Sequence, residues 1–169
     1  MNAMLSAWND ADEAVALEAM LACCGAREWA SAMIALRPID NVLELSEAAD
    51  RVWATMTEAD WMEAFACHPR IGERKAVQAT AKSAMWSGQE QSSVATAESL
   101  VLEELAETNV QYEQKFGFTY IVCATGKTAD EMLAILKRRM ANDRASELRE
   151  AAEQQHQITQ IRLGKWLVE

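Results

Sequence analysis

Residues that interrupt secondary structure are scarce in this sequence. Only two prolines and six glycines occur among its 169 residues, too few for a linker or a disordered tail. Half of the residues are hydrophobic and a quarter are charged, as is typical of a globular protein with one core. The length fits a single domain, which we expect to span residues 1–169.

Histidine and cysteine are also scarce, and their spacing disfavours the common metal and disulfide frameworks. The two histidines, His68 and His156, are far apart in the chain. Two of the four cysteines are adjacent and the other two are isolated, without CxxC spacing. We therefore expect no metal site, and reduced thiols of the kind found in the cytoplasm.

Long apolar runs, a basic leader and an excess of positive charge are missing too. No run approaches the roughly 18 apolar residues of a membrane span, and the start turns acidic by Asp10, unlike a signal peptide. Lysine and arginine total 16 against 26 acidic residues, so the net charge is −10. Such a surface repels phosphate backbones and anionic lipids, which makes nucleic acid and membranes poor partners.

What the sequence does contain is helical periodicity. Apolar residues recur at intervals of three and four, and Thr128 with Glu131 has the spacing of a capping box. Pro69 disfavours helical geometry at His68, so the preceding helix must end near Cys67. The predicted helices cover residues 10–24, 27–36, 46–56, 57–67, 75–85, 89–115 (with a break near 96), 128–140 and 143–166.

One segment departs from this pattern. The run FTYIVCA at residues 118–124 is the only β-like stretch, and a lone strand cannot form a sheet without partners. We therefore predict an all-α fold, a single compact multi-helix domain with one extended apolar core segment near residues 118–124.

His68 is the first candidate for chemistry. It stands at a helix end before Pro69, so its imidazole is held on a restricted backbone, and histidine is well suited to proton transfer near neutral pH. Alternatively, the ring only satisfies the end of the helix. The neighbouring Cys67 suggests a thiolate pair, although a buried, inert cysteine is the commoner case. His156 lies among glutamines and glutamates, typical of a solvated helix face.

Two other polar groups interrupt the apolar pattern. Ser87 and Glu90 have the spacing of a capping box, and with Gln91 they would line a helix N-terminus whose N–H groups point the same way. The alternative is that they only cap the helix. Arg162 lies at the apolar boundary of the last helix, where an arginine usually extends into solvent or pairs with a carboxylate, and less often clamps an anion or a carbonyl.

At these positions the sequence resembles the OHCU decarboxylase family in four ordered elements. They are HPRIGE at 68–73, S-x-x-E-Q at 87–91, N-x-x-Y-x-x-K-F-G-F at 109–118 and I-R-L at 161–163. The resemblance implies an all-α, cofactor-free decarboxylase, typically a homodimer. It would act on 2-oxo-4-hydroxy-4-carboxy-5-ureidoimidazoline (OHCU) in urate catabolism and protonate the product on one face, giving (S)-allantoin.

The resemblance also implies roles for individual residues. His68 matches the proton-donating histidine, and Glu90 and Arg162 match the other catalytic positions. The positions that match substrate-binding residues, the last five through their backbone, are Pro69, Ser87, Gln91, Tyr120, Ile121, Val122, Cys123 and Ala124.

The residue types suit this chemistry. Loss of CO₂ leaves an electron pair that the ring C=N accepts, and backbone N–H groups of an extended segment can stabilise the developing charge, whereas amides inside a helix are already paired. We expect Glu90 to hold the C4 hydroxyl and Gln91 to bind the ureido or ring amides. Arg162 is expected to bind carbonyl oxygens, because gripping the departing carboxylate would stabilise the ground state.

Two alternative functions remain open at this point. One is a non-catalytic helical binding or scaffold protein that keeps the family core. The other is a Cys–His hydrolase that uses Cys67 as its nucleophile.

Overall fold

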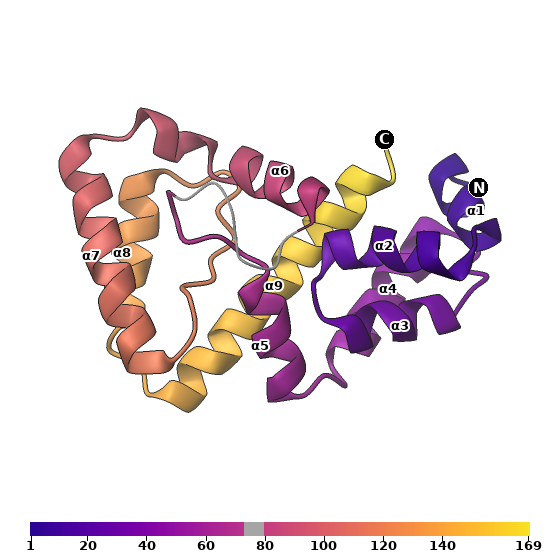
Figure 1. The fold of residues 1–169 in the computed structure, drawn as a ribbon, viewed down its shortest axis with the longest axis horizontal. Coiled ribbons are helices and arrows are strands. Elements are labelled where there is room, and N and C mark those ends of the chain that lie inside the picture. Colours follow the sequence, from indigo (N-terminus) through magenta and orange to yellow (C-terminus); the bar gives the residue numbers. More distant parts are fainter. Residues whose placement is uncertain (73–79) are drawn as a thin grey trace. The chain divides into compact units, whose positions relative to one another are not determined.

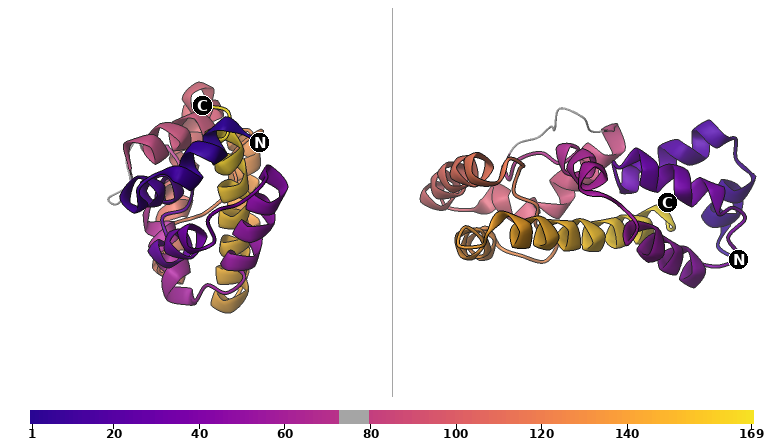
Figure 2. Two further views of the ribbon diagram at one scale, coloured as in Figure 1. Left: turned by 90° about the vertical axis from the view of Figure 1, so that its right-hand side faces the viewer. Right: turned by 90° about the horizontal axis from the view of Figure 1, so that it is seen from below.

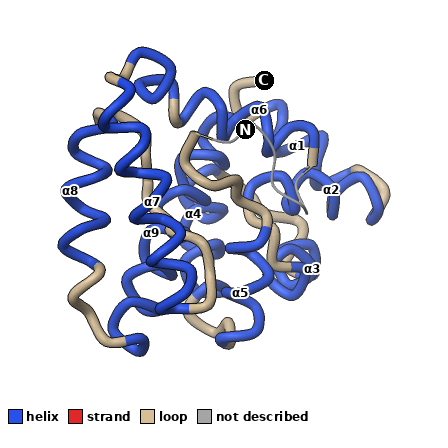
Figure 3. The backbone as a smooth tube through the Cα atoms, turned by 60° about the vertical axis from the view of Figure 1, so that its left-hand side comes forward, coloured by secondary structure: helices blue, strands red, loops and turns tan. Residues whose placement is uncertain are grey.

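The computed structural model describes residues 1–72 and 80–169 of the chain, and these are helical almost throughout (Figure 1). Within the described residues there are nine α-helices, one short 3₁₀ helix and no strand. Figure 3 accordingly shows helices and loops and no strand in this part of the chain. The predicted all-α class is confirmed. No helix in this part of the chain is both long and apolar enough to cross a membrane.

The chain divides into two compact units, one of Met1–Ala64 with His156–Glu169 and one of Phe65–Gln155. The helices of the first are α1 (Ala3–Asp10), α2 (Glu13–Cys23), α3 (Arg27–Ala35), α4 (Val42–Trp53) and most of α5 (Glu58–Ala66). The second holds α6 (Ala81–Glu90), η1 (Ser92–Thr96), α7 (Ser99–Phe116) and α8 (Ala129–Arg139). The long helix α9 (Arg144–Trp166), seen along its length in the right view of Figure 2, contributes to both units.

The predicted helix starts at Thr57, Thr128 and Asp143 are confirmed. The N–H of Thr57 donates to Asp60 at 2.8 Å, and Thr128 forms a full capping box with Glu131. Asp143 accepts a hydrogen bond from the N–H of Ser146 at 2.8 Å. These side chains satisfy N–H groups that the first turn of a helix leaves without partners.

The N-terminal unit corrects three of the predicted boundaries. Asp10 does not start a helix as predicted, since it is the last residue of α1 and α2 begins at Glu13. Helix α1 was not expected, and it begins because the side chain of Asn2 accepts the N–H of Leu5 at 3.0 Å. Helix α4 begins four residues before the predicted residue 46, since Asn41 accepts the N–H of Glu44 at 2.9 Å. In both cases a single asparagine cap sets the start of the helix.

Helix α6 corrects the expectation for Ser87. The helix begins after Thr80, whose hydroxyl accepts the N–H of Ser83 at 3.0 Å, and it continues to Glu90. Ser87 therefore lies in its last turn, where carbonyl groups and not N–H groups lack helical partners. The predicted capping role of Ser87 and Glu90 is wrong. Residues 75–79 of the helix predicted at 75–85 lie outside the described residues.

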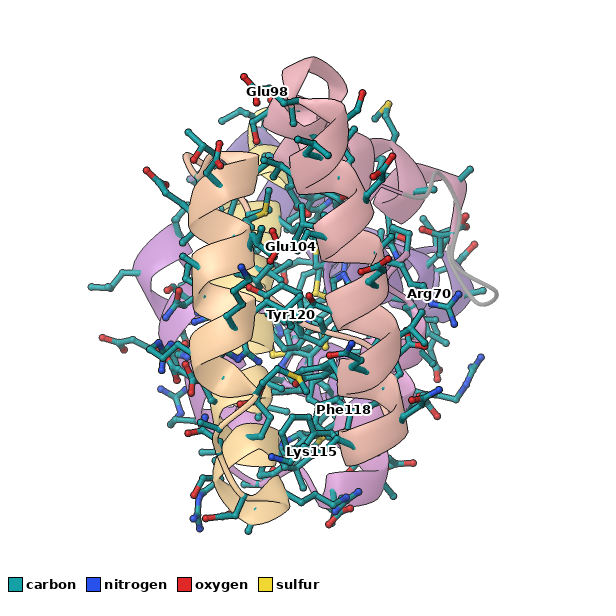
Figure 4. The ribbon with its side chains drawn as sticks, turned by 90° about the vertical axis from the view of Figure 1, so that its left-hand side faces the viewer. Arg70, Glu98, Glu104, Lys115, Phe118 and Tyr120 are labelled. Carbon is teal, nitrogen blue, oxygen red and sulfur yellow. The ribbon has the colours of Figure 1, made fainter. Side chains whose placement is uncertain are left out.

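The second unit packs an aromatic cluster between α7 and α8, which lie side by side (Figures 1 and 4). The rings of Tyr112 and Phe116 on α7 pack against those of Phe118 and Tyr120, and the last two lie between the helices in Figure 4. Gly117 joins the two pairs with φ +83°, a left-handed conformation that ends α7 as predicted. The chain then continues as the predicted extended segment 118–124, which is buried in the core.

Candidate functional site

The predicted proton donor, His68, lies just after the end of α5. Its N–H donates to the carbonyl of Phe65 at 3.1 Å, which closes the helix end, and the buried Pro69 follows. The Phe65 ring packs against Phe118 with 5.3 Å between centroids. Phe65, the second-last residue of α5, therefore contacts Phe118, the first residue of the extended segment, and this brings two predicted parts of the site together.

The loop after Pro69 is held from two sides. The guanidinium of Arg70 donates to both carboxylate oxygens of Glu113 on α7, at 2.8 and 2.7 Å. The hydrogen bond from Arg70 lowers the pKa of Glu113. Two residues further on, the N–H of Gly72 donates to the side-chain oxygen of Gln91 at 3.0 Å. The histidine loop is thus tied both to α7 and to the end of α6.

The polar end of α6 carries the next three predicted residues. Ser87 is 3% exposed in the last turn, and Glu90 and Gln91 are partly exposed. Because Gln91 contacts Gly72, the structure places this helix end against the histidine loop. These residues lie at the C-terminus of α6, which is the negative end of its helix dipole. Any binding of substrate at this helix end therefore depends on the side chains themselves.

The extended segment is fixed by side chains along its length. Arg139 donates to the carbonyl of Ile121 at 2.6 Å, and Lys127 donates to that of Cys123 at 2.7 Å. The hydroxyl of Tyr120 donates to the carbonyl of Met132 at 2.9 Å. Backbone that is neither helix nor sheet needs such partners when it is buried.

Three amides of this segment have no such partner among the described residues. In the described part of the chain, the N–H groups of Ile121, Val122 and Ala124 donate no hydrogen bond, although these residues are 6% exposed or less. A buried N–H without an acceptor costs about 1–3 kcal/mol. These three amides are therefore ready donors for a bound oxyanion or carbonyl.

A buried charged pair anchors the segment from behind. Arg139 and Glu147 are both fully buried, and the Tyr112 hydroxyl donates to the same Glu147 oxygen at 2.5 Å. The Arg139 guanidinium also lies over the Tyr120 ring, 4.9 Å from its centroid. Burial and the hydrogen bond to Glu147 raise the pKa of Tyr112, so its hydroxyl keeps its proton.

Two consecutive glutamines of α9 contact two different parts of the site. The side-chain oxygen of Gln154 accepts the N–H of Cys123 at 2.8 Å. That of Gln155 lies 2.6 Å from Nε2 of His68, and Gln155 is fully buried. One turn of α9 therefore joins the histidine loop to the extended segment.

Arg162 is the one predicted site residue in the other unit. It is 2% exposed, and its guanidinium donates to the carbonyl of Ala22 at 3.4 Å. The expected alternative, an arginine extending into solvent, is wrong because the side chain is buried. The remaining predicted residues all belong to Phe65–Gln155.

The other histidine and the cysteines have different surroundings. His156 lies 2.5 Å from a carboxylate oxygen of Asp50, so it is paired and not simply solvated as expected. None of the four cysteines, all of which the structure describes, is in a disulfide. Among the described residues, no group of three or more His, Cys, Asp and Glu side chains could hold a metal ion.

Sequence reasoning missed Gln155, Gln154 and Arg139. Gln155 could have been found, because it falls four residues after Ala151 and three before Ile158, on the apolar stripe of α9. A glutamine at such a position must bond to a polar partner in the core. Arg139 carried no comparable signal, since a basic residue at a helix end is common on the surface.

Comparison with known proteins shows which family this chain resembles. The family model described as OHCU decarboxylase matches residues 9–164. The uric acid degradation bifunctional protein TTL of Arabidopsis thaliana is 40% identical over 144 residues, which are 85% of this chain and 44% of that protein. This chain thus spans less than half the length of the plant relative. The 2-oxo-4-hydroxy-4-carboxy-5-ureidoimidazoline decarboxylase of Haloferax volcanii is 26% identical, over 76% of this chain and 74% of that protein.

A solved structure of the same family is also similar to this chain in sequence and fold. The crystal structure of OHCU decarboxylase in the presence of (S)-allantoin has 37% sequence identity and a TM-score of 0.76, covering 88% of this chain and 96% of that one. The match of the family model over nearly the whole chain and this level of identity lead to one conclusion. The chain belongs to the OHCU decarboxylase family.

Proposed function

We propose that this chain decarboxylates OHCU and protonates the neighbouring ring carbon, C5, on one face to give (S)-allantoin, as a carboxy-lyase of urate degradation. Family membership supports the reaction, and one observation supports the site. His68, Gln91 and the amides of residues 121–124 belong to one compact unit and are joined through the contacts of Gly72, Gln154 and Gln155.

In the proposed reaction, the bond between C4 and its carboxylate breaks and CO₂ leaves. The electron pair passes from C4 into the adjacent ring C=N, so the substrate itself accepts it and no cofactor is required. The N–H groups of Ile121, Val122 and Ala124 stabilise the negative charge that develops on the substrate. The ring nitrogen takes up the proton that the C4 hydroxyl loses as C4 becomes a carbonyl. The His68 imidazolium donates one proton to C5, the carbon that bears the ureido group, and becomes neutral.

The other residues bind and orient the substrate. Glu90 accepts the hydrogen bond of the C4 hydroxyl, and Gln91 binds the ureido group or the ring amides. Ser87 and Pro69 line the site. The role that the family resemblance implies for Arg162 is to bind carbonyl oxygens that gain charge as CO₂ leaves, because holding the scissile carboxylate would retard the reaction.

The test is an assay on freshly generated OHCU that follows the optical activity of the allantoin formed. We expect rapid formation of (S)-allantoin, and a loss of about 10²- to 10⁴-fold in kcat for His68→Asn. His156→Asn is the matched control, since the chain has only these two histidines and His156 pairs with Asp50. Slow, racemic allantoin from the wild-type protein would favour the non-catalytic scaffold instead.

We propose further that residues 1–169 act as one functional domain, because the family model spans both units. The family resemblance also supports a homodimer as the working form, which light scattering tests directly. We also propose a cytoplasmic location, because the spacing of the four cysteines in the sequence fits no disulfide framework.

A further inference from the structure

We infer that Gln155 is a positioning residue for His68 and fixes the tautomer whose proton is on Nε2, so that the proton delivered to substrate travels on Nδ1. The first half of this inference concerns the protein alone. The second half rests on the proposed function.

The geometry of the contact carries the inference. The carboxamide oxygen of Gln155 lies 2.6 Å from Nε2 of His68, a short hydrogen bond for a nitrogen donor. A carboxamide oxygen can only accept, so the ring nitrogen that faces it must carry the proton. In the neutral imidazole, the other nitrogen, Nδ1, then has the lone pair.

The surroundings of Gln155 make this contact specific. The side chain is fully buried within α9, a helix that also contacts Cys123 through the preceding Gln154. A buried amide oxygen without a donor is unfavourable, so the hydrogen bond is favoured over an empty contact. On the histidine side, Pro69 and the hydrogen bond from the His68 N–H to Phe65 restrict the backbone. Both partners are thus held in place before substrate binds.

The consequence for the reaction follows from proton balance. The imidazolium carries protons on both nitrogens, and one of them is transferred to C5 of the substrate after CO₂ has gone. Because Gln155 keeps the proton on Nε2, the transferred proton comes from Nδ1, and the product is the neutral Nε2–H tautomer. Water or buffer then restores the proton on Nδ1 for the next turnover. A histidine held in one tautomer presents the same nitrogen in each cycle, which suits protonation on a single face.

Nitrogen-15 NMR of histidine-labelled protein tests the tautomer without substrate. The chain has two histidines, so His156→Asn leaves His68 as the only labelled ring. Above the pH at which His68 titrates in the same experiment, we expect Nε2 to have the shift of a protonated ring nitrogen and Nδ1 that of an unprotonated one. The reverse pattern would overturn the inference.

Variants of the glutamine separate positioning from folding. Gln155→Met removes the acceptor and should give a mixture of tautomers, whereas Gln155→Glu restores an oxygen and should keep Nε2–H. Gln154→Met is the matched control: it removes the neighbouring contact with Cys123 and should leave the His68 tautomer unchanged. If Gln155→Met does not fold, Gln155→Asn, whose shorter side chain cannot reach the ring, replaces it. An unchanged tautomer in a folded variant without the acceptor contradicts the inference.

Kinetics then test the link to catalysis. In the OHCU assay, Gln155→Met should lower kcat by about tenfold or more with a much smaller change in KM, and Gln155→Glu should recover part of that loss. A change in KM with kcat unaltered would contradict a role through His68. Wild-type protein without activity would instead refute the proposed function. The NMR test of the His68 tautomer needs no substrate, so its outcome does not depend on that activity.

Discussion

The Nε atom of Arg139 lies 2.6 Å from Oε1 of Glu147, and neither side chain has any exposed surface. The same guanidinium donates to the carbonyl of Ile121 at 2.6 Å, in the middle of the extended segment. Burying a charged pair costs free energy of desolvation. In this protein Arg139 also bonds to the backbone that is proposed to bind substrate. The pair therefore connects the stability of the second unit to the shape of the site.

The first prediction concerns this pair. Glu147→Gln should lower the free energy of unfolding by about 3–5 kcal/mol, because it leaves the Arg139 guanidinium buried without its counter-charge. Urea denaturation followed by circular dichroism measures the change. Glu104→Gln is the control, since Glu104 pairs with Lys137 on the surface and should cost less than about 1 kcal/mol. A loss no larger than that of the control would contradict the prediction.

The second prediction concerns Gly117, which joins α7 to the extended segment. Gly117→Ala should cost about 1–2 kcal/mol, because an L-residue is strained at φ +83° even though no atom lies within 4 Å of the added Cβ. Gly164→Ala, inside α9 and equally uncrowded, should instead stabilise the protein by about 0.5–1 kcal/mol. Thermal unfolding of the two variants should shift in opposite directions, and shifts of equal sign would count against this account.

The contrast between local and long-range signals explains how much of the structure was predictable. Thr128 with Glu131, the stop before Pro69 and the turn at Gly117 are local patterns, and each marked a helix boundary correctly. The extended segment at 118–124 was also predicted, because an apolar run without strand partners has few other places in a helical core. These features depend on residues close together in the sequence.

The errors arise where two local signals compete or where the partner is remote. Ser87 has the spacing of an N-cap, but Thr80 caps an earlier start and α6 runs through it. The pairing of Gln155 with His68 joins residues 87 positions apart, so only the fold reveals it. Burial of Arg139 likewise depends on Glu147 from the next helix. The candidate residues could be named from the sequence, but not the contacts that hold them.

The third prediction is a pH dependence set by Arg70 and Glu113. The pKa of Glu113 is lowered from 4.5 in the folded protein by the hydrogen bond from Arg70, so the unfolded state takes up this proton first as the pH falls. The contribution of the pair to stability is therefore fully present above pH 4.5 and is lost as the pH falls through the lowered value. The difference in unfolding free energy between wild type and Glu113→Gln should be constant from pH 6 to 8 and shrink below about pH 4.5.

Arg70→Met serves as the second arm of that experiment. It removes the other partner of the same ion pair, so its stability difference from wild type should fall away over the same pH range. A difference that grows on acidification for either variant would reverse the sign and contradict the assignment.

The fourth prediction separates the decarboxylase from a Cys–His hydrolase. Cys67 is adjacent to His68 in sequence and is partly buried, and it follows the last residue of α5. The proposed reaction forms no covalent intermediate, so Cys67→Ala should keep kcat and KM within about twofold of wild type. The OHCU assay measures both, with alkylation by iodoacetamide as a second probe. Inactivation by either treatment would support a thiol nucleophile.

The last prediction concerns Arg162, whose guanidinium is 2% exposed and donates to the carbonyl of Ala22. Lysine keeps the positive charge but loses the planar fork that binds two oxygens at once. If Arg162 binds carbonyl oxygens that gain charge as CO₂ leaves, Arg162→Lys should lower kcat/KM by roughly 10- to 100-fold, mostly through kcat. A change mainly in KM would instead indicate binding of the ground-state carboxylate, and an unchanged kcat/KM would exclude the bidentate role. Arg51→Lys, on the exposed surface of α4, is the matched control and should leave both constants unchanged.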